Sequence, residues 1–261
     1  MKAVFSYYNT TGNVLQPRHY LNSEFFLLSW ALSTNLAKKQ FEEVELVTDS
    51  ESAKIFEKLQ LPVTIRTELD NLNYNKTHWA LGKIKAYQIQ DKPFIHIDDD
   101  VFLFSNLEER IKNAPIAFQN KEENEWFDNC YKQKLTYLNE ISHPNYAVNM
   151  GLYLCNDLEF NKKYCKQVFD FVNRHNVSIL KSSDAGYYSM VFEQFIAAKV
   201  IEELKIIPEF ISKNHIKEEY LRQKYVHIWG AKKNGWWLDK VKEIVQLHYR
   251  NYIEIINELI K

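Results

Sequence analysis

The chain of 261 residues lacks any apolar run of about 18 residues, so no segment is expected to span a membrane. Its first residues lack the apolar stretch of a signal peptide. The three cysteines are odd in number and lack the spacing of a metal site, which favours reduced thiols. These absences predict a cytoplasmic protein, with peripheral contact to a membrane surface left open.

Net charge is also lacking, because 33 basic residues face 34 acidic ones, which leaves −1. A balance of this kind predicts no nucleic-acid partner and no strong attraction to anionic lipid. There is no glycine-rich phosphate loop of the G-x-x-x-x-G-K type. The sequence has no internal repeat, low-complexity tract or linker, so we expect one domain over residues 1–261. An apolar content of 46% indicates a globular protein with a sizeable core.

Apolar patterns of strand and helix type alternate along the chain. Strands are expected at 3–8, 44–48, 63–69, 94–97, 115–119 and 205–210, and helices at 22–39, 50–60, 78–90, 106–113, 157–175, 185–199 and 238–260. Residues 121–146 show no clean period and are expected to form an irregular insertion suited to acceptor binding. The alternation predicts an α/β fold with a mainly parallel central sheet flanked by helices.

Three adjacent carboxylates, Asp98, Asp99 and Asp100, lie inside the apolar segment 94–104. In an extended chain Asp98 and Asp100 would share one side, with Asp99 turned away. Burying such charges is costly without a cation, so a divalent metal is one interpretation. The alternative is an acidic turn open to water. The position at the carboxyl end of a parallel strand, where α/β folds place their ligands, fits the first.

Two other segments supply candidate ligand contacts. Tyr7, Asn9 and Thr10 stand at the end of the first expected strand, either as nucleotide contacts or in a plain surface turn. Lys83, on the helix before the acidic segment, can reach a phosphate or a sugar hydroxyl, or it is a solvated lysine. A glycine after an asparagine, at Asn149-Met150-Gly151, suggests close backbone approach or a bulge.

A second polar cluster reads H-x-x-G-x-x-K-x-x-W from His227 to Trp236. A neutral imidazole at His227 can complete a metal site begun by Asp98 and Asp100, or it is a satisfied core histidine. Gly230 would let the backbone approach a ligand, and Lys233 could neutralise a phosphate. The nitrogen ligand favours Mn²⁺ over Mg²⁺ and Ca²⁺.

These motifs resemble those of GT-A fold glycosyltransferases, most closely the retaining family eight, the glycogenin and galactosyltransferase group, and suggest a bacterial branch of it. In that family an apolar strand ends in D-x-D, as Ile95 to Val101 does here. An F-N-A-G-like segment is similar to residues 148–151, with Met for Ala. A D-Q pair resembles Glu193-Gln194, and H-x-x-G-x-x-K-P-W resembles residues 227–236, with two residues in place of the proline.

The resemblance implies a metal-dependent glycosyltransferase with a UDP-sugar donor, Mn²⁺ or Mg²⁺, and a glycan or other acceptor. It implies that Asp98, Asp100 and His227 are metal ligands and that Asp98 also contacts the ribose. Lys233 would bind the diphosphate, and Asn149 and Gly151 would lie beside the sugar. Glu193 or Gln194 would lie near the anomeric carbon. Retention of configuration needs no protein base. Inversion would need one, and Glu193 or Asp184 would serve. A nucleotidyltransferase and a non-catalytic binding module are the alternatives, and the oligomeric state is left open.

Overall fold

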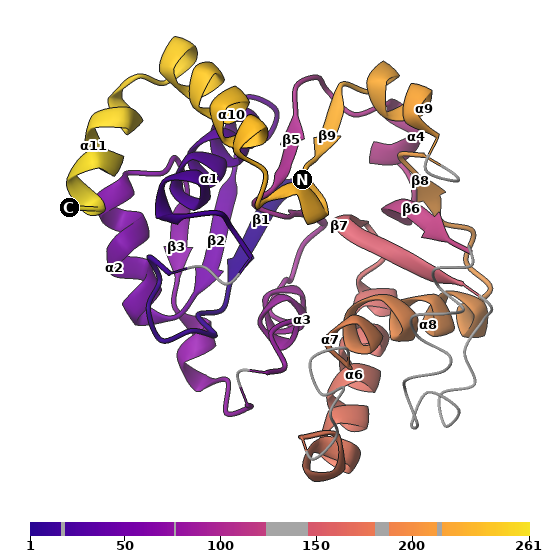
Figure 1. Ribbon diagram of the computed structural model, residues 1–261. Helices are drawn as coiled ribbons and strands as arrows, with labels where there is room; N and C mark the ends of the chain where they lie inside the picture. Colours follow the sequence, from indigo (N-terminus) through magenta and orange to yellow (C-terminus); the bar gives the residue numbers. More distant parts are fainter. Residues whose placement is uncertain (17–18, 76, 124–145, 181–187, 213–215) are drawn as a thin grey trace.

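The computed structural model describes residues 1–261 except 17–18, 76, 124–145, 181–187 and 213–215 (Figure 1). The described residues form a seven-stranded sheet in the order β3-β2-β1-β4-β7-β6-β8. Its strands are β1 (Lys2–Tyr7), β2 (Val44–Thr48), β3 (Thr64–Arg66), β4 (Phe94–Ile97), β6 (Ile116–Glu122), β7 (Ala147–Cys155) and β8 (Glu209–Phe210). All run in one direction except β7, which is antiparallel to both neighbours. The expected α/β fold with a mainly parallel sheet is confirmed.

A separate two-stranded ribbon pairs β5 (Val101–Leu103) with β9 (Tyr225–His227). The helices are α1 (Ser23–Lys38), α2 (Ser50–Leu59), α3 (Leu81–Gln88), α4 (Glu109–Lys112), α6 (Leu158–Leu180), α7 (Tyr188–Met190), α8 (Ile196–Leu204), α9 (Lys217–Arg222), α10 (Gly235–His248) and α11 (Asn251–Leu259). A π-helix, Val191–Phe195, leads into α8. No helix in the described ranges is long and apolar enough to cross a membrane.

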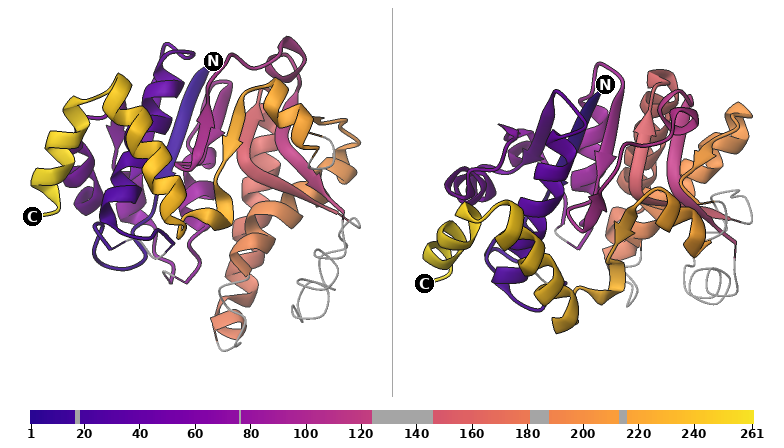
Figure 2. Two further views of the ribbon diagram at one scale, coloured as in Figure 1. Left: turned by 45° about the horizontal axis from the view of Figure 1, so that its top comes forward. Right: turned by 90° about the horizontal axis from the view of Figure 1, so that it is seen from above.

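Helices cover both faces of the sheet (Figures 1 and 2), and apolar side chains form two hydrophobic clusters. On β4, Phe94 joins the cluster that contains α3, α6 and α8, whereas Ile95 and Ile97 join the cluster of α1, α10 and α11. Successive strand residues point to opposite faces, so this four-residue strand serves both cores. The carboxyl end of β4 is therefore held firmly from both sides.

Side-chain caps fix the helices that flank the N-terminal half of the sheet. The Asn22 side chain accepts a hydrogen bond from Phe25 N at 2.8 Å, as the sequence predicts for the start of α1. Asp49 caps α2 by accepting from Ser52 N at 2.9 Å. Such caps satisfy amides that the first helical turn leaves unbonded.

Several expected elements differ from the structure. The strands expected at 63–69 and 205–210 shrink to three and two residues, and a 3₁₀ turn over Glu68–Asn71 ends the first of them. The helix expected at 106–113 is limited to the four residues of α4. Short apolar runs carry a strand pattern but form a strand only where a neighbour supplies the ladder.

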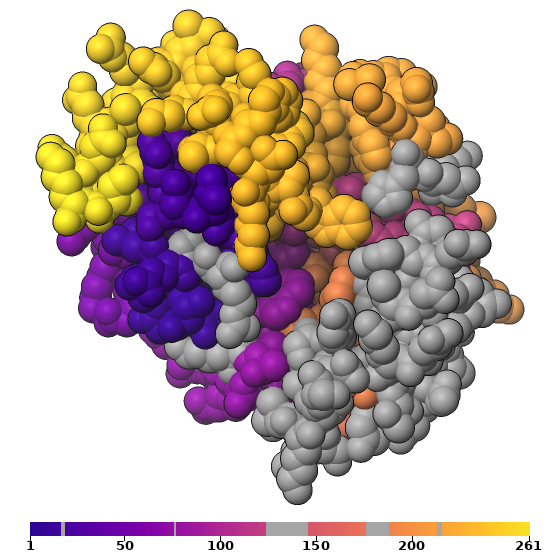
Figure 3. All heavy atoms as spheres, in the orientation of Figure 1, coloured from indigo at the N-terminus to yellow at the C-terminus, as the bar shows by residue number. Residues whose placement is uncertain are grey.

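The single C-terminal helix expected at 238–260 is two helices, because Tyr249 leaves the helical conformation with φ −145°. The break lets α10 contact α1 and lets α11 contact both α1 and α2, so these helices pack on other helices rather than on the sheet. His248, the last residue of α10, is exposed at the break. Figure 3 shows this C-terminal segment (yellow) lying over N-terminal residues (indigo).

Candidate metal centre

The three carboxylates occupy a tight turn between β4 and β5. Asp98 N donates to Gly151 O at 3.0 Å, and Val101 N donates back to Asp98 O at 3.0 Å, which closes the turn. Asp99 is not part of the candidate metal group, and its carboxylate accepts a hydrogen bond from Tyr20 Oη at 2.6 Å. Asp98 and Asp100 thus face one site as expected, but a turn and not an extended strand brings them there.

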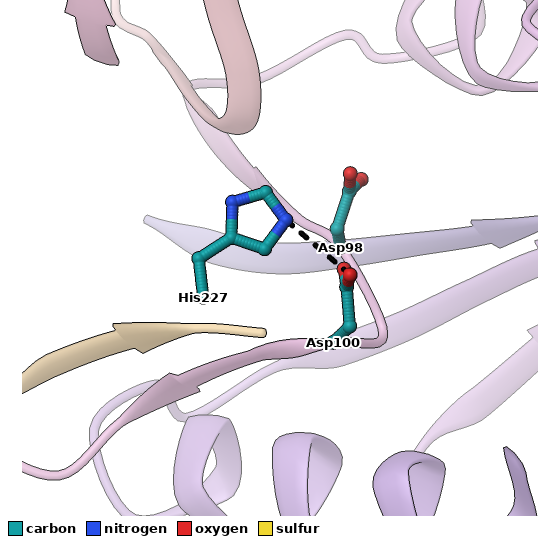
Figure 4. A group of neighbouring side chains, drawn as sticks. All are labelled: Asp98, Asp100 and His227. Atoms are coloured by element: carbon teal, nitrogen blue, oxygen red, sulfur yellow. Dashed lines mark ion pairs between the residues drawn. The ribbon is translucent and has the colours of Figure 1, made fainter. Parts of the chain in front are cut away.

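The β5–β9 ribbon brings His227 to this turn, because His227 pairs with Val101, the residue that follows Asp100. The next amide, Ile228 N, donates to Asp100 O at 3.1 Å and fixes the register. His227 Nε2 then lies 3.3 Å from Asp100 Oδ2, with the imidazole facing the carboxylate (Figure 4). One ligand atom from each of Asp98, Asp100 and His227 lies within 4.8 Å of the others, so this group could hold a metal ion.

The His227 ring is oriented by Gln119, a residue within β6. Gln119 Oε1 lies 2.6 Å from His227 Nδ1 and also accepts from Tyr225 Oη at 2.7 Å. Because that amide oxygen can only accept, the imidazole proton sits on Nδ1 and the Nε2 lone pair faces Asp100. Partners of this kind fix the tautomer and direction of histidines that bind metals.

Gly151 makes room for this arrangement. A Cβ at position 151 would lie 2.4 Å from Gln119 Oε1 and 2.7 Å from His227 Cε1. The pairing of β6 with β7 is irregular between Phe118 and Asn120, directly opposite this glycine. Both features suggested by the Asn149-Met150-Gly151 sequence, a bulge and a close approach, are present.

Two partly buried lysines balance part of the acidic charge. Lys83 Nζ lies 2.7 Å from Asp98 Oδ1 and 2.5 Å from Glu193 Oε1, so it is not the solvated lysine of the alternative interpretation. Lys232 Nζ lies 2.9 Å from Asp100 Oδ2. These two lysines therefore offset part of the free-energy cost of burying the aspartates. The metal interpretation of the sequence had a divalent cation offset all of it.

The electrostatic effects differ between the two metal-facing carboxylates. Burial raises the pKa of Asp98 to about 7, although Lys83 opposes the rise. Burial acts on Asp100 too, but the ammonium group of Lys232 holds the pKa of Asp100 well below its usual range. For Lys83, burial alone would lower the pKa, and the carboxylates of Asp98 and Glu193 raise it above the ordinary value. Asp100 is therefore the permanently charged member of the centre.

A divalent cation fits the remaining needs of the site. Asp100 Oδ1 is buried and has no hydrogen-bond partner, whereas Asp98 Oδ1 and Asp100 Oδ2 each contact one lysine ammonium group. A histidine lone pair and a carboxylate oxygen 3.3 Å apart repel unless a cation or proton lies between them. Buried oxygens that lack partners normally signal a missing group. The set of two carboxylates and one imidazole suits Mn²⁺ or Mg²⁺.

Glu193 and Gln194 reach the site from the π-helix. Tyr164 Oη donates to Glu193 O at 2.7 Å, which satisfies a carbonyl that the wider turn leaves free. Insertions of this type are frequent at functional sites because they rotate side chains out of the regular helical order. The Glu193 carboxylate contacts Lys83, and Gln194 Oε1 is buried without a hydrogen-bond partner.

A cleft of about 580 Å³ brings most of the predicted residues together. Its lining includes Tyr7, Thr10, Lys83, Asp98, Asp99, Asp100, Asn149, Gly151, Glu193, Gln194, His227, Gly230 and Lys233. Asn9 is not among the lining residues: its side chain is buried and accepts from Gly12 N at 3.1 Å, within the turn after β1. Asp184 and most of the expected acceptor-binding insertion lie outside the described residues.

Sequence reasoning missed three residues of the site: Gln119, Tyr20 and Lys232. Gln119 carried a usable signal, since it is the polar residue that ends an expected apolar strand. Lys232 was passed over for its neighbour Lys233, and only the backbone path after β9 decides which lysine faces Asp100. Tyr20 lies in a segment without a periodic pattern and carried no signal.

Comparison with known proteins places the chain in a family. A family model described as "family of unknown function (DUF6734)" matches residues 1–259, and the chain belongs to this family. A comparison with curated proteins found no match.

Solved structures with similarity to the chain include sugar and nucleotide transferases. Mouse xyloside xylosyltransferase 1 is 12% identical, over 80% of this chain and 85% of that one, with TM-score 0.44. The galactosyltransferase LgtC with donor and acceptor sugar analogs is 15% identical, over 73% and 70%, with TM-score 0.39. The CTP:phosphocholine cytidylyltransferase LicC of Streptococcus pneumoniae is 14% identical, over 85% and 97%, with TM-score 0.41. At these identities, the function of this chain has to be inferred from its own residues.

Proposed function

We propose that this chain is a metal-dependent glycosyltransferase that moves a sugar from a UDP-sugar donor to a glycan or other acceptor. The observation that carries the proposal is the convergence of Asp98, Asp100 and His227, from segments far apart in the sequence, at one cleft. Asp98, Asp100 and His227 would hold Mn²⁺ or Mg²⁺. When bound, the metal would stabilise negative charge on the leaving diphosphate.

The other residues of the cleft are assigned around the donor. Tyr7 and Thr10, at the end of β1, would contact the nucleotide, with Asp98 and Asp99 near the ribose. The backbone at Gly230 would approach the diphosphate. Asn149 and Gly151 would border the sugar, because they stand on β7 beside His227 and line the same cleft.

We propose that the reaction retains the configuration of the sugar. Each carboxylate that lines the cleft within the described ranges already has a partner: Lys83 for Asp98 and Glu193, Tyr20 for Asp99, and Lys232 for Asp100. In the proposed complex Asp98 and Asp100 would hold the metal, and Glu193 and Asp99 keep these partners, so none of the four is assigned as a base. The leaving phosphate would then take the acceptor's proton, while Gln194 faces the sugar.

The test is release of nucleoside diphosphate from a panel of UDP-sugars with Mn²⁺, measured by a coupled assay. We expect turnover in the wild type and loss of at least about a hundredfold in Asp100→Ala, because the metal loses its fully charged ligand. Unchanged turnover in Asp100→Ala would refute the metal assignment. Release of pyrophosphate from a nucleoside triphosphate would instead show a nucleotidyltransferase, and tight UDP binding without any turnover would show a binding module.

A further inference from the structure

We propose that Lys232 occupies Asp100 until metal and donor bind, and then moves to the donor's diphosphate, so that metal and nucleotide bind cooperatively. This inference rests on the proposed function, because it assigns a role to Lys232 at the same site. It assigns to Lys232 the diphosphate contact that the resemblance implies for Lys233.

The contact that carries the inference is the ion pair between Lys232 Nζ and Asp100 Oδ2, at 2.9 Å. The same oxygen lies 3.3 Å from His227 Nε2. A cation bound by these two atoms would share the oxygen with the ammonium group of Lys232. Two positive charges in contact with one buried oxygen repel each other strongly, so Lys232 competes with the metal for Asp100.

The backbone of Lys232 is anchored, whereas its ammonium group lies at the end of a flexible stem. Leu21 N donates to Lys232 O at 2.9 Å, and Lys232 Nζ lies 5.2 Å from the centre of the Tyr20 ring. Tyr20 in turn donates a hydrogen bond to the carboxylate of Asp99. The side chain of Lys232 is 21% exposed and lines the cleft, so rotation about its four-carbon stem is enough to carry the charge toward a ligand there.

Leaving Asp100 is favourable only where another anion receives the lysine. A diphosphate bound in the cleft supplies that anion, whereas a metal ion alone does not. A metal ion that binds alone must therefore break the ion pair between Lys232 and Asp100 without a compensating contact. When a diphosphate is bound as well, the new contact between Lys232 and the diphosphate offsets part of that free-energy cost. By linkage, the nucleotide strengthens metal binding by the same factor by which metal strengthens nucleotide binding.

Lys233 offers a matched comparison one residue away. Its side chain is exposed and lines the same cleft, and in the described part of the chain no ion pair joins it to a carboxylate. Removing its charge alters the field at the cleft without removing a competitor for Asp100. The two lysines thus predict different results for metal binding without nucleotide.

The experiment measures Mn²⁺ affinity of the full chain, from the electron paramagnetic resonance signal of free Mn²⁺, with and without saturating UDP. Lys232→Gln removes the charge but keeps a hydrogen-bond donor for Asp100, which protects folding. We expect it to bind Mn²⁺ alone about tenfold more tightly than the wild type, because a like charge leaves a desolvated site. The factor by which UDP strengthens Mn²⁺ binding should fall by about tenfold or more. Lys233→Gln should leave Mn²⁺ binding without UDP unchanged, and Lys232→Arg should keep the wild-type coupling.

Two outcomes would overturn the inference: Mn²⁺ affinity in Lys232→Gln equal to or weaker than that of the wild type, or the same gain in Lys233→Gln. Failure of the metal centre itself has a different signature. If Asp100→Ala binds Mn²⁺ as the wild type does, the proposed function fails whatever the lysine variants show. Thermal unfolding of each variant confirms that the folded chain is being compared.

Discussion

Replacing Gly151 with alanine tests the link between packing and the metal centre. The added Cβ would lie 2.4 Å from Gln119 Oε1 and 2.7 Å from His227 Cε1. Ordinary contacts begin near about 3.4 Å, so the neighbours must move by roughly 1 Å. Gln119 cannot give way freely, because Tyr225 and His227 both hold its oxygen. The imidazole must therefore shift relative to Asp100.

The expected cost has two parts. Overpacking of this kind destabilises a fold by about 1–3 kcal/mol, which for a chain of this length lowers the melting temperature by roughly 2–10 °C. A displaced ligand with a disturbed orienting partner lowers metal affinity by about 10–100-fold. Calorimetric melting and Mn²⁺ titration measure the two parts separately.

Gly230→Ala is the control for Gly151→Ala. Gly230 lines the same cleft, but a Cβ there meets nothing within 4 Å. The same chemical change should therefore leave stability and metal affinity near the wild-type values. If Gly151→Ala also melted and bound Mn²⁺ like the wild type, the close approach of Gly151 to His227 would not constrain the centre, and the reasoning would be refuted.

Three further predictions concern neighbours of the same centre. Gln119→Met removes the acceptor for His227 Nδ1 and should weaken Mn²⁺ binding about 10–100-fold in the same titration, and an unchanged value would contradict the orienting role. Because burial raises the pKa of Asp98 to about 7 and the metal binds the deprotonated carboxylate, Mn²⁺ affinity should rise between pH 6 and pH 8 and level off above, whereas a flat profile would contradict the raised pKa. Lys83→Met leaves Asp98 and Glu193 buried without their cation and should lower the free energy of unfolding by about 3–5 kcal/mol in urea denaturation at pH 8, and a loss below about 1 kcal/mol would show that solvent compensates.

The sequence is sufficient to predict the alternating α/β order and the position of the three acids at the end of β4. Strand and helix periods are local properties, and the cap at Asn22 shows that local chemistry can fix an element's start. The reversed direction of β7 was not predictable in this way, because it depends on which neighbours the strand meets across the sheet. The break at Tyr249 likewise follows from packing on α1 and α2, since the apolar stripe continues across it.

The candidate site likewise combines features that the sequence predicts with features that depend on contacts between distant segments. Residue types and motif order brought Asp98, Asp100 and His227 into one hypothesis. Their actual contact depends on the register between β5 and β9, which pairs segments more than a hundred residues apart. The choice between Lys232 and Lys233 depends on a single turn of backbone, which no residue pattern encodes. The π-helix that positions Glu193 is also invisible in the sequence, because one extra residue in a turn leaves an apolar helix apolar.

The short β5–β9 ribbon has a consequence for the order of events during synthesis. The acidic turn leaves the ribosome about a hundred residues before the strand that delivers the imidazole. Polypeptides are synthesised at about 5–20 residues per second, so the three aspartates are made several seconds before His227. A nascent chain released before residue 227 would carry the three acids without the imidazole, and the candidate metal centre would be complete only after residue 227 emerges.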